Sequence, residues 1–493
     1  MIFKTARDVA AHLAAHTPRH LINGRLVASD KRFEVFDPAT DEVVAQCFEA
    51  NREQLDEAVA AARRAQPAWA AMPIQERRAC LRRMSDALRA NADELAALVT
   101  LEQGKPLARA RDEVIRSADQ SDAVTSIALA PVVLRDDASG RVELRHRPLG
   151  VVGAITPWNM PLVLSAPKIA HALYTGNTIV LKPSPYAPLA VLRMGELLRD
   201  VFPPGCVNIL AGGNDFGAWM TAHPGIDKIA FTGSSATGKR VMASAASNLK
   251  RVTLELGGND PAIVLDDVDV EAVAPKLFAA AFVNSGQVCM AIKRLYVHES
   301  IHDELAAALA RIAKSVKVDH GFADGCDYGP VQNRAQYETV KGILEDTQAR
   351  GATVLAGGKA MARPGYFIEP TIVTGLAEGS RLVDEEPFGP VLPILRFTDV
   401  EDAVRRANSS PYGLGASVWS ADANRAADIA VRLEAGTAWV NRHVGVDAMV
   451  PFGGAKQSGV GREFGVQGLS DYTDMQSVFV PAGARPADPV NAP

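Results

Sequence analysis

Cysteine is scarce in this chain of 493 residues, and no two cysteines form a C-x-x-C pair. The five cysteines are Cys47, Cys80, Cys206, Cys289 and Cys326. An odd and scattered set excludes a disulfide framework and a cysteine zinc site, and it is typical of proteins from reducing compartments. No metal site is expected.

Long apolar runs and an excess of one charge are also missing. No run reaches the ~18 residues of a membrane span, and residues 1–20 lack the apolar core of a signal peptide. A mitochondrial presequence is the alternative for this segment because of Lys4, Arg7 and Arg19, but Asp8 counts against it. The net charge of −5, with both signs interspersed, gives no footprint for nucleic acid. We predict a cytoplasmic protein without membrane or nucleic-acid partners.

The G-x-G-x-x-G fingerprint of dinucleotide-binding folds is absent from the strand-to-helix turns. Residues 233–239 are a near miss to a phosphate-binding P-loop, but Arg240 stands where Ser or Thr would hold magnesium. A strand that ends near Phe231 feeds a helix that opens at Ser234, and the free N–H groups of such a helix suit a pyrophosphate. An ordinary capped helix start is the alternative.

The periodicity of the chain predicts an α/β fold. Hairpins are expected about Asn23-Gly24 and about residues 136–140, and helices over residues 54–71, 74–102 and 107–128. Short apolar strands (151–155, 177–181, 207–210, 228–231, 251–256) then alternate with helices (162–173, 189–198, 216–222, 235–247), and the rhythm recurs from 262 to 440. Parallel sheets of this kind bind ligands at the carboxyl ends of their strands.

Cys289 ends an apolar stretch, residues 282–290, just before a predicted strand at residues 292–297. Such a helix-to-strand junction can present a thiol to a cleft, although buried free cysteine is usually inert. Glu255 lies in an otherwise apolar strand that Gly257-Gly258 ends. Burial would raise its pKa towards a value useful for a base, and a salt-bridged strand residue is the alternative.

Seven short segments occur together in an order that is similar to the aldehyde dehydrogenase superfamily. They are Ile155-Thr-Pro-Trp-Asn-Met-Pro161, Leu181-Lys-Pro183, Phe231-Thr-Gly-Ser234, Leu254-Glu-Leu-Gly-Gly258, Gly286-Gln-Val-Cys289, Glu386-Pro-Phe-Gly-Pro390 and Pro451-Phe-Gly-Gly454. The resemblance runs from about residue 21 to about residue 480. It implies two Rossmann-like parallel-sheet domains and a small projecting β element for oligomerisation.

The domain boundaries follow from the resemblance and the periodicity. We expect a dinucleotide-binding domain at residues 1–130 and 150–257, a catalytic domain at 258–470, and the β element at 131–149 and 471–482. That element would pair with another subunit of a homodimer or homotetramer. Residues 483–493 are expected to be a disordered tail.

The resemblance implies a thioester mechanism. Cys289 would attack the aldehyde carbon, and the Asn159 amide with the Cys289 backbone N–H would stabilise the oxyanion. Glu255 would activate the water that hydrolyses the thioester. Lys168 and Glu463 match a proton relay. A relative that transfers the acyl group to coenzyme A is one alternative, against which Glu255 counts; a non-catalytic protein on the same scaffold is the other.

The cofactor is expected to be NAD or NADP, with NAD favoured. Many NAD-preferring relatives carry a Glu three residues after the lysine that matches Lys182; here Pro185 stands there, which removes a charge that repels a 2′-phosphate. Glu386 and Phe388 would hold the nicotinamide ribose and ring. The remaining cofactor contacts implied by the resemblance are Ile155, Thr156, Pro157, Trp158, Ser184, Phe231, Thr232, Gly233, Ser234, Gly238, Leu256 and Gly257.

The substrate, a small aldehyde, would pass through a mostly aliphatic tunnel. By the same resemblance its lining comprises Met160, Val163, Leu164, Val283, Met290, Val444, Val446 and Phe452. Arg442 and His443 precede part of this lining and could meet a carboxylate at the entrance, although solvation at the surface is the expected role.

Overall fold

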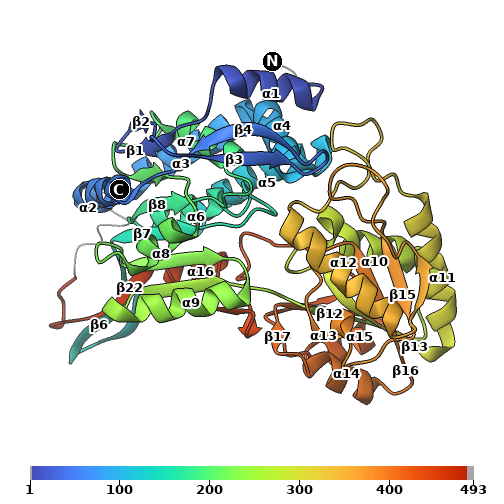
Figure 1. The fold of residues 1–493 in the computed structure, drawn as a ribbon. Helices are drawn as coiled ribbons and strands as arrows, with labels where there is room; N and C mark the ends of the chain where they lie inside the picture. Colours follow the sequence, from blue (N-terminus) through green and yellow to red (C-terminus); the bar gives the residue numbers. More distant parts are fainter. Residues whose placement is uncertain (1–2, 486–493) are drawn as a thin grey trace.

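The computed structural model describes residues 3–485 as two bodies that lie side by side (Figure 1). An eight-stranded sheet forms the first body and a seven-stranded sheet the second. Parallel pairs form the centre of both sheets, which confirms the predicted α/β class. The predicted disordered tail lies outside the described residues from 486 onwards.

The first sheet has the strand order β2 (Arg25–Val27), β1 (His20–Ile22), β9 (Val207–Ile209), β8 (Thr178–Lys182), β7 (Val151–Ile155), β10 (Lys228–Thr232), β11 (Arg251–Glu255) and β21 (Gly459–Val460). The predicted hairpin at β1–β2 is confirmed, and its turn residues Asn23 and Gly24 both have positive φ. β21 pairs antiparallel with β11. The chain therefore returns to the first sheet within the range predicted for the catalytic domain.

Helices α1 to α9 and α16 belong to this body. Their bounds are α1 (Ala6–Ala15), α2 (Arg52–Ala71), α3 (Ile74–Ala90), α4 (Ala92–Gln103), α5 (Leu107–Val124), α6 (Ala166–Tyr174), α7 (Leu189–Leu198), α8 (Asn214–Ala222), α9 (Ser235–Ala245), η1 (Ala246–Asn248) and α16 (Gly465–Ser470). The single helix predicted over residues 74–102 is wrong, because Asn91 breaks it. The Asn91 side chain donates to the Ala87 carbonyl (2.8 Å) and its backbone leaves helical geometry.

The second sheet has the order β14 (Thr353–Ala356), β15 (Thr371–Thr374), β16 (Val391–Phe397), β13 (Ile292–His298), β12 (Asp260–Val264), β18 (Gly415–Trp419) and β19 (Thr437–Val440). Its helices are α10 (Val270–Phe282), η2 (Val283–Gly286), α11 (Glu299–Ser315), α12 (Arg334–Ala349), α13 (Arg381–Asp384), α14 (Val400–Asn408) and α15 (Ala423–Ala430).

Three small sheets complete the fold. Two are pairs, β3 (Arg32–Asp37) with β4 (Glu42–Phe48) and β17 (Tyr412–Gly413) with β20 (Ala455–Lys456). The third joins β22 (Thr473–Val480), β6 (Gly140–Pro148) and β5 (Val132–Asp137). It includes the second predicted hairpin and extends beyond the first body at the lower left of Figure 1.

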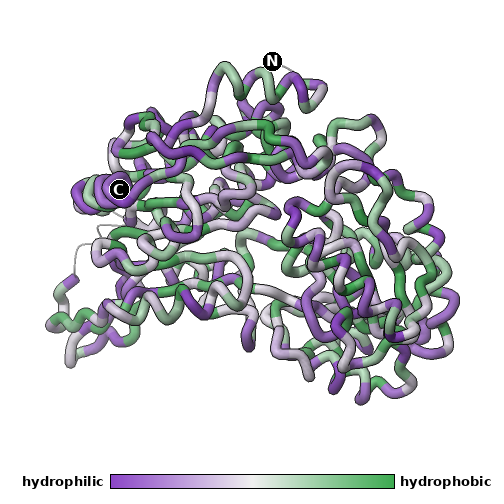
Figure 2. The backbone as a smooth tube through the Cα atoms, in the orientation of Figure 1, coloured by the Kyte–Doolittle hydropathy of each residue, from purple (hydrophilic) through white to green (hydrophobic). Residues whose placement is uncertain are grey.

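The hydrophobic cores lie on both faces of each large sheet. Successive strand residues, such as Val151 and Val152, belong to different core clusters, because successive side chains of a strand point to opposite faces of the sheet. The outer helix α1 alternates hydrophilic and hydrophobic residues and buries Val9 and Leu13 (Figure 2). Among residues 3–485 no helix is long and apolar enough to cross a membrane.

Candidate active site

Four adjacent parallel strands of the first sheet end at one edge, β8 with Lys182, β7 with Ile155, β10 with Thr232 and β11 with Glu255. Ile155 pairs with Lys182, and Thr232 pairs with Glu255. The carboxyl ends of parallel strands form the ligand-binding edge of such a sheet. Several residues that the sequence predicts to be functional, although far apart in the chain, thus lie side by side at this edge of the sheet.

Cys289 lies between the two bodies, after a sharp turn that follows α10. Asn284, Ser285 and Gly286 have consecutive positive φ angles of 51°, 56° and 73°. A Cβ atom at Gly286 would collide with the Gly389 carbonyl, so only glycine fits there. Part of the Cys289 residue is exposed to solvent. Its thiol is nevertheless surrounded by protein, and this burial raises the pKa of the thiol to about 12, while the nearby Lys293 opposes the shift. In the cofactor-free protein the thiol is therefore protonated at neutral pH.

Lys293 holds the Cys289 loop through its backbone carbonyls. Its ammonium donates to the carbonyls of Val288 (2.6 Å) and Cys289 (2.9 Å). It also lies 3.2 Å from a carboxylate oxygen of Glu386, which accepts from the Gly258 N–H. One buried lysine thus links the cysteine loop to the residue that the sequence predicts to hold the nicotinamide ribose.

Asn159 lies beside this loop. Its side-chain amide donates to the Gln287 carbonyl (2.9 Å), and its backbone carbonyl accepts from Lys105 Nζ (2.9 Å) and Asn284 Nδ2 (3.0 Å). The predicted oxyanion group and the predicted nucleophile therefore sit on segments that are hydrogen-bonded to each other.

Glu255 has an unusual environment. Only 4% of the residue is exposed, and neither carboxylate oxygen has a hydrogen-bond partner among the described residues. Burial and the neighbouring Glu463 raise its pKa well above the ordinary value, while Lys168 opposes the shift. Lys168 and Glu463 themselves form a buried ion pair. The structure thus brings the predicted base and the predicted relay together.

The predicted cofactor residues lie along and beside the carboxyl edge of the first sheet and have features that fit a dinucleotide. Ser234 caps α9 and accepts from the Thr237 N–H (3.3 Å), which leaves other N–H groups of the first turn free for a phosphate. A Cβ atom at Gly233 would collide with the Phe231 ring, one at Gly238 with Leu256, and one at Gly257 with Glu386. The buried hydroxyl of Thr232 has no partner among the described residues.

Segments next to this edge carry further predicted contacts. Trp158 and Phe388 meet edge to face, with ring centroids 5.5 Å apart. Lys182 is buried, which lowers its pKa to about 8, and Pro185 lines a cavity of about 870 Å³. Thr156 shares a hydrogen bond with Ser165 (2.9 Å). The other members, Pro157 and Ser184, lie in the same two segments.

Comparison with known proteins identifies the family. The aldehyde dehydrogenase family profile matches residues 26–478. The chain belongs to this family. It is an NAD(P)-dependent aldehyde dehydrogenase, and its fold matches family structures with two Rossmann-like domains.

Several relatives match over nearly their whole length. An aldehyde dehydrogenase of Leishmania tarentolae, described as mitochondrial, is 40% identical over 472 residues, 93% of this chain and 94% of its own. Retinal dehydrogenase 2 of Gallus gallus is 40% identical over 466 residues, 92% and 89% of the two chains. The NAD⁺ complex of Bacillus cereus aldehyde dehydrogenase superposes with a TM-score of 0.93 at 38% identity, covering 96% and 98%. Staphylococcus aureus betaine aldehyde dehydrogenase, also with NAD⁺, gives 0.91 at 32% identity, covering 98% and 99%.

The predicted tunnel residues of this dehydrogenase do not all lie in one cluster. Met290, Val446 and Phe452 pack with Cys289 in one small cluster at the junction of the two bodies. Val444 packs instead against the core of the second body. Met160 accepts from Lys105 through its sulfur, and Val163, Leu164 and Val283 are buried or half-buried.

Lys105 and Glu113 are site residues that the sequence reasoning missed. Their side chains form a fully buried ion pair of 2.5 Å. Lys105 holds the Asn159 carbonyl, and Glu113 accepts from the N–H groups of Leu162 (2.9 Å) and Val163 (3.3 Å). The pair therefore positions the whole Asn159 loop, and it delays the predicted helix at residues 162–173 until Ala166. The available signal was a lysine between two predicted helices and a glutamate inside the second of them, a region interpreted only as scaffold.

His443 does not have the predicted role at the surface, because its side chain is fully buried. Trp419 Nε1 donates to Ser417 Oγ (2.9 Å), and this hydroxyl lies 2.8 Å from His443 Nδ1. His443 Nε2 in turn donates to the Met290 carbonyl (3.0 Å), next to Cys289. The adjacent Arg442 is exposed, as predicted.

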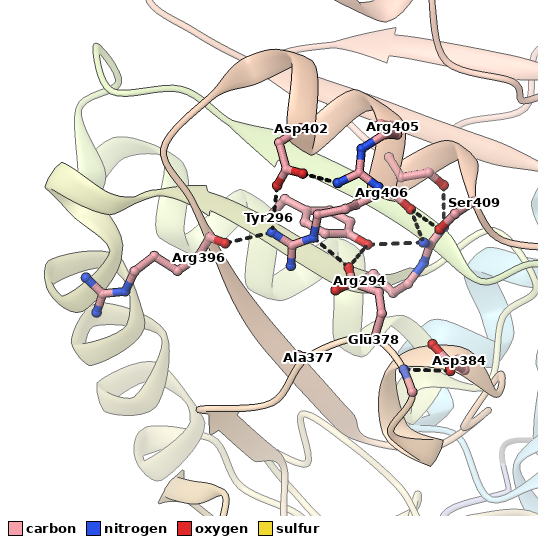
Figure 3. A network of polar contacts seen from close by, with 12 residues as sticks. Arg294, Tyr296, Ala377, Glu378, Asp384, Arg396, Asp402, Arg405, Arg406 and Ser409 are labelled. Atoms are coloured by element: carbon pink, nitrogen blue, oxygen red, sulfur yellow. Dashed lines mark hydrogen bonds and ion pairs between the residues drawn. The ribbon is translucent and has the colours of Figure 1, made fainter.

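Polar side chains of β13 bind two further segments, and Figure 3 shows the contacts around Arg294 and Tyr296. Arg294 Nε donates to the Asn259 carbonyl (2.8 Å), in the peptide between β11 and β12. The Tyr296 hydroxyl donates to Glu378 (3.1 Å), which also accepts from Arg406 Nε (2.8 Å). The strand that follows the cysteine loop thus fixes both the link between the two sheets and the loop at Glu378.

Proposed function

We propose that this enzyme oxidises an aldehyde to the carboxylic acid through hemithioacetal and thioester intermediates on Cys289. The observation that carries the proposal is the buried, unpaired carboxyl of Glu255 at the strand edge that faces the Cys289 loop. Such a group can accept a proton from a water that enters the site. Coenzyme A transfer would not require a base at this position.

The chemistry divides between a few side chains. The Cys289 thiol loses its proton to a water that enters the site, and the sulfur adds to the aldehyde carbon; the oxyanion that forms accepts hydrogen bonds from the Asn159 amide and the Cys289 N–H. Bound NAD(P) would supply the acceptor for the hydride that the adduct loses when it becomes a thioester. Glu255 takes a proton from water, the hydroxide adds to the thioester carbon, and the Cys289 thiolate leaves with the free acid as product. The Lys168–Glu463 pair receives the proton from Glu255.

The cofactor would lie along the carboxyl edge of the first sheet, in a dinucleotide-binding domain of residues 1–130 and 150–257. We assign the pyrophosphate to the N-terminus of α9 at Ser234, the adenosine ribose to Lys182, and the nicotinamide ribose and ring to Glu386 and Phe388. Gly233 and Gly257, where an added Cβ atom would collide with the Phe231 ring and the Glu386 carboxylate, have no side chain that would stand between the backbone and a ligand at this edge.

The substrate class can be found with a panel of aldehydes of increasing length and charge. Each is incubated with NAD or NADP, the absorbance of the reduced nicotinamide is followed, and the free acid is quantified. We expect acid and reduced cofactor in equal amounts. Reduced cofactor without acid, unless coenzyme A is added, would contradict the hydrolytic proposal.

Cofactor preference should respond to the charge at position 185. We expect turnover with both cofactors, with NAD favoured, since Glu34, Asp41 and Glu338 line the cavity beside Pro185 against the single cation Arg334. Pro185→Glu should lower kcat/KM for NADP by about tenfold or more and leave NAD within about threefold, because like charges repel the 2′-phosphate. Pro185→Gln is the uncharged control. Complete NAD specificity of the wild type would mean that another group guards this position.

The thiol of Cys289 should react as a group with a raised pKa. Below its pKa, the thiolate fraction of a thiol grows about tenfold per pH unit. We therefore expect alkylation of Cys289 by iodoacetamide, in cofactor-free protein, to accelerate about tenfold per unit from about pH 7 to about pH 9. Peptide mass spectrometry would measure the rate. A rate that does not change with pH would show that the thiolate is already formed.

We also propose that the β5–β6–β22 sheet joins copies of the chain into a homodimer or homotetramer. Apolar side chains on its outer strands are exposed, with exposures of 59% for Leu134, 69% for Met475 and 71% for Phe479. An exposed apolar sheet edge of this kind favours pairing with another chain.

A charge on this sheet should reduce the oligomer. Phe479→Asp should shift the molar mass measured by light scattering after gel filtration towards that of one chain, because burial of an aspartate in an apolar interface is costly. Val431→Asp, at an 82% exposed position in the second body, is the control. An unchanged mass for Phe479→Asp would place the interface elsewhere.

A further inference from the structure

A cavity of about 250 Å³ in the first body carries an unusual concentration of positive charge. It lies where the start of α3, the segment after α5, the end of β6 and the end of α6 meet. We name it the basic cavity; its lining includes Arg77, Arg78, His146, Arg147, Tyr174 and Thr473, and no acidic residue lines it. It is separate from the residues assigned to the active site above.

Arg77 is a buried cation without an anionic partner. Only 3% of the residue is exposed, and it forms no ion pair within residues 3–485. Its Nη1 donates to the Ala70 carbonyl (3.2 Å), while its Nε, also buried, has no partner there. Lys105 and Lys168, which are buried to a similar degree, each have a carboxylate. Lys182 and Lys228 donate only to neutral oxygens, but burial lowers the pKa of Lys182 to about 8 and that of Lys228 to about 7, so both can lose their charge, which an arginine cannot. A buried, unpaired charge is costly, so Arg77 is where a missing anion is expected.

Arg78 repeats this pattern on the next residue of α3. Its Nη2 donates to the Tyr174 hydroxyl (3.0 Å), and its guanidinium lies over the Tyr174 ring at 5.8 Å from the centroid. Its Nε is buried and has no partner among the described residues. Two adjacent guanidinium groups thus keep unused donors at one cavity.

His146 adds a third nitrogen group to the wall. The Thr473 hydroxyl donates to the Ser470 carbonyl (2.8 Å), so it accepts from His146 Nδ1–H (2.8 Å). This fixes the ring and leaves Nε2 outside that bond. Ile74 and Leu129 provide an apolar wall.

We propose that the basic cavity binds a small oxyanion, a phosphate or a carboxylate, held by Arg77 and Arg78. The planar fork of a guanidinium matches two oxygens of either group, and such charged hydrogen bonds are stronger than neutral ones. Since the cavity also touches β6 and the start of β22, the anion would stiffen the base of the projecting sheet. The proposal is independent of the proposed reaction.

Titration calorimetry with the full chain tests this site. Inorganic phosphate and acetate are titrated separately in the presence of saturating NAD, so that the pyrophosphate site is filled. We expect saturable binding of at least one anion to the wild type, and the anion that binds identifies the ligand class. Arg78→Gln should weaken binding by about tenfold or more. Arg82→Gln, which removes the same charge from an exposed position of α3, should bind as the wild type does.

A second variant separates binding from folding. Arg77→Lys keeps the charge but loses the planar fork of the guanidinium, so it should weaken anion binding. The aldehyde turnover and the unfolding temperature of Arg78→Gln and Arg82→Gln should stay at wild-type values. Absence of saturable binding for both anions would overturn the proposal. Equal affinities of Arg78→Gln and wild type for the anion would also overturn it, because they would mean an adventitious ion only. A third contrary result is an oligomer mass that falls when phosphate is added although no saturable binding is measured; this would assign the cavity to a carboxylate of a second copy of the chain.

Discussion

Replacement of Cys289 by alanine is expected to lower aldehyde oxidation by at least about 10⁴-fold while NAD binding and the fold persist. The sulfur forms the bond that holds the substrate through both intermediates, and no other group near Asn159 can replace it. The loop itself is held by backbone contacts: Lys293 donates to the Val288 and Cys289 carbonyls. Removal of the sulfur therefore leaves the loop in place.

The matched control is Cys326→Ala. Cys326 is the other partly exposed cysteine of the described chain, but its sulfur is engaged with the carbonyls of Asp319 (3.4 Å) and Tyr328 (3.3 Å). Its loss should leave turnover within about twofold. Steady-state turnover, NAD titration and thermal unfolding are measured for both variants. Substantial turnover of Cys289→Ala, well above that of buffer, would contradict the thioester mechanism.

Local patterns in the sequence were enough to predict much of the fold. The β1–β2 turn depends on Asn23-Gly24, and these two residues take the positive φ angles that the hairpin needs. Cys289 was found from the motif Gly286-Gln-Val-Cys289, and the structure shows that Gly286 occupies a backbone position that other residues cannot adopt. Glu255 stood out because a carboxylate interrupts an apolar strand, and its oxygens indeed lack partners.

Long-range contacts explain what could not be predicted. Lys105 reaches Asn159, 54 positions away, and Glu113 reaches Leu162 across 49. No local periodicity reports such contacts. His443 was expected at the surface together with Arg442, whereas its hydrogen bond to Met290 spans 153 positions. The return of β21 to the first sheet likewise depends on pairing with β11, not on its own two residues.

Replacement of Glu255 by glutamine is expected to separate the two halves of the reaction. Thioester formation requires the thiol, the oxyanion contacts and the cofactor, whereas release requires a base that makes water nucleophilic. General-base assistance is worth roughly 10²–10⁴-fold. Glutamine keeps the size of the side chain but cannot take the proton. The variant should therefore form about one equivalent of reduced cofactor in a rapid burst and then turn over about 10²–10⁴-fold more slowly.

The raised pKa of Glu255 adds a pH signature with a defined sign. A base acts only when ionised, so burial, which raises this pKa, moves the ascending limb of wild-type turnover to higher pH. Glu255→Gln should lose that limb. The folded state also holds this proton more tightly than the unfolded state. Glu255 therefore lowers the stability of the protein as the pH rises above the ordinary pKa of a glutamate. The glutamine variant should then unfold at a higher temperature than the wild type at alkaline pH, which excludes misfolding as the cause of lost turnover.

A rapid-mixing trace at saturating aldehyde, with intact-protein mass after acid quench, decides this assignment. We expect the mass of Glu255→Gln to increase by that of the acyl group, and the double variant Cys289→Ala with Glu255→Gln to show neither burst nor adduct. Since Glu463 raises the pKa of Glu255 and pairs with Lys168, Glu463→Gln should shift the turnover limb to lower pH and slow thioester release less than Glu255→Gln does. Wild-type steady-state turnover in Glu255→Gln, or a burst without an adduct on Cys289, would remove Glu255 from the hydrolytic step.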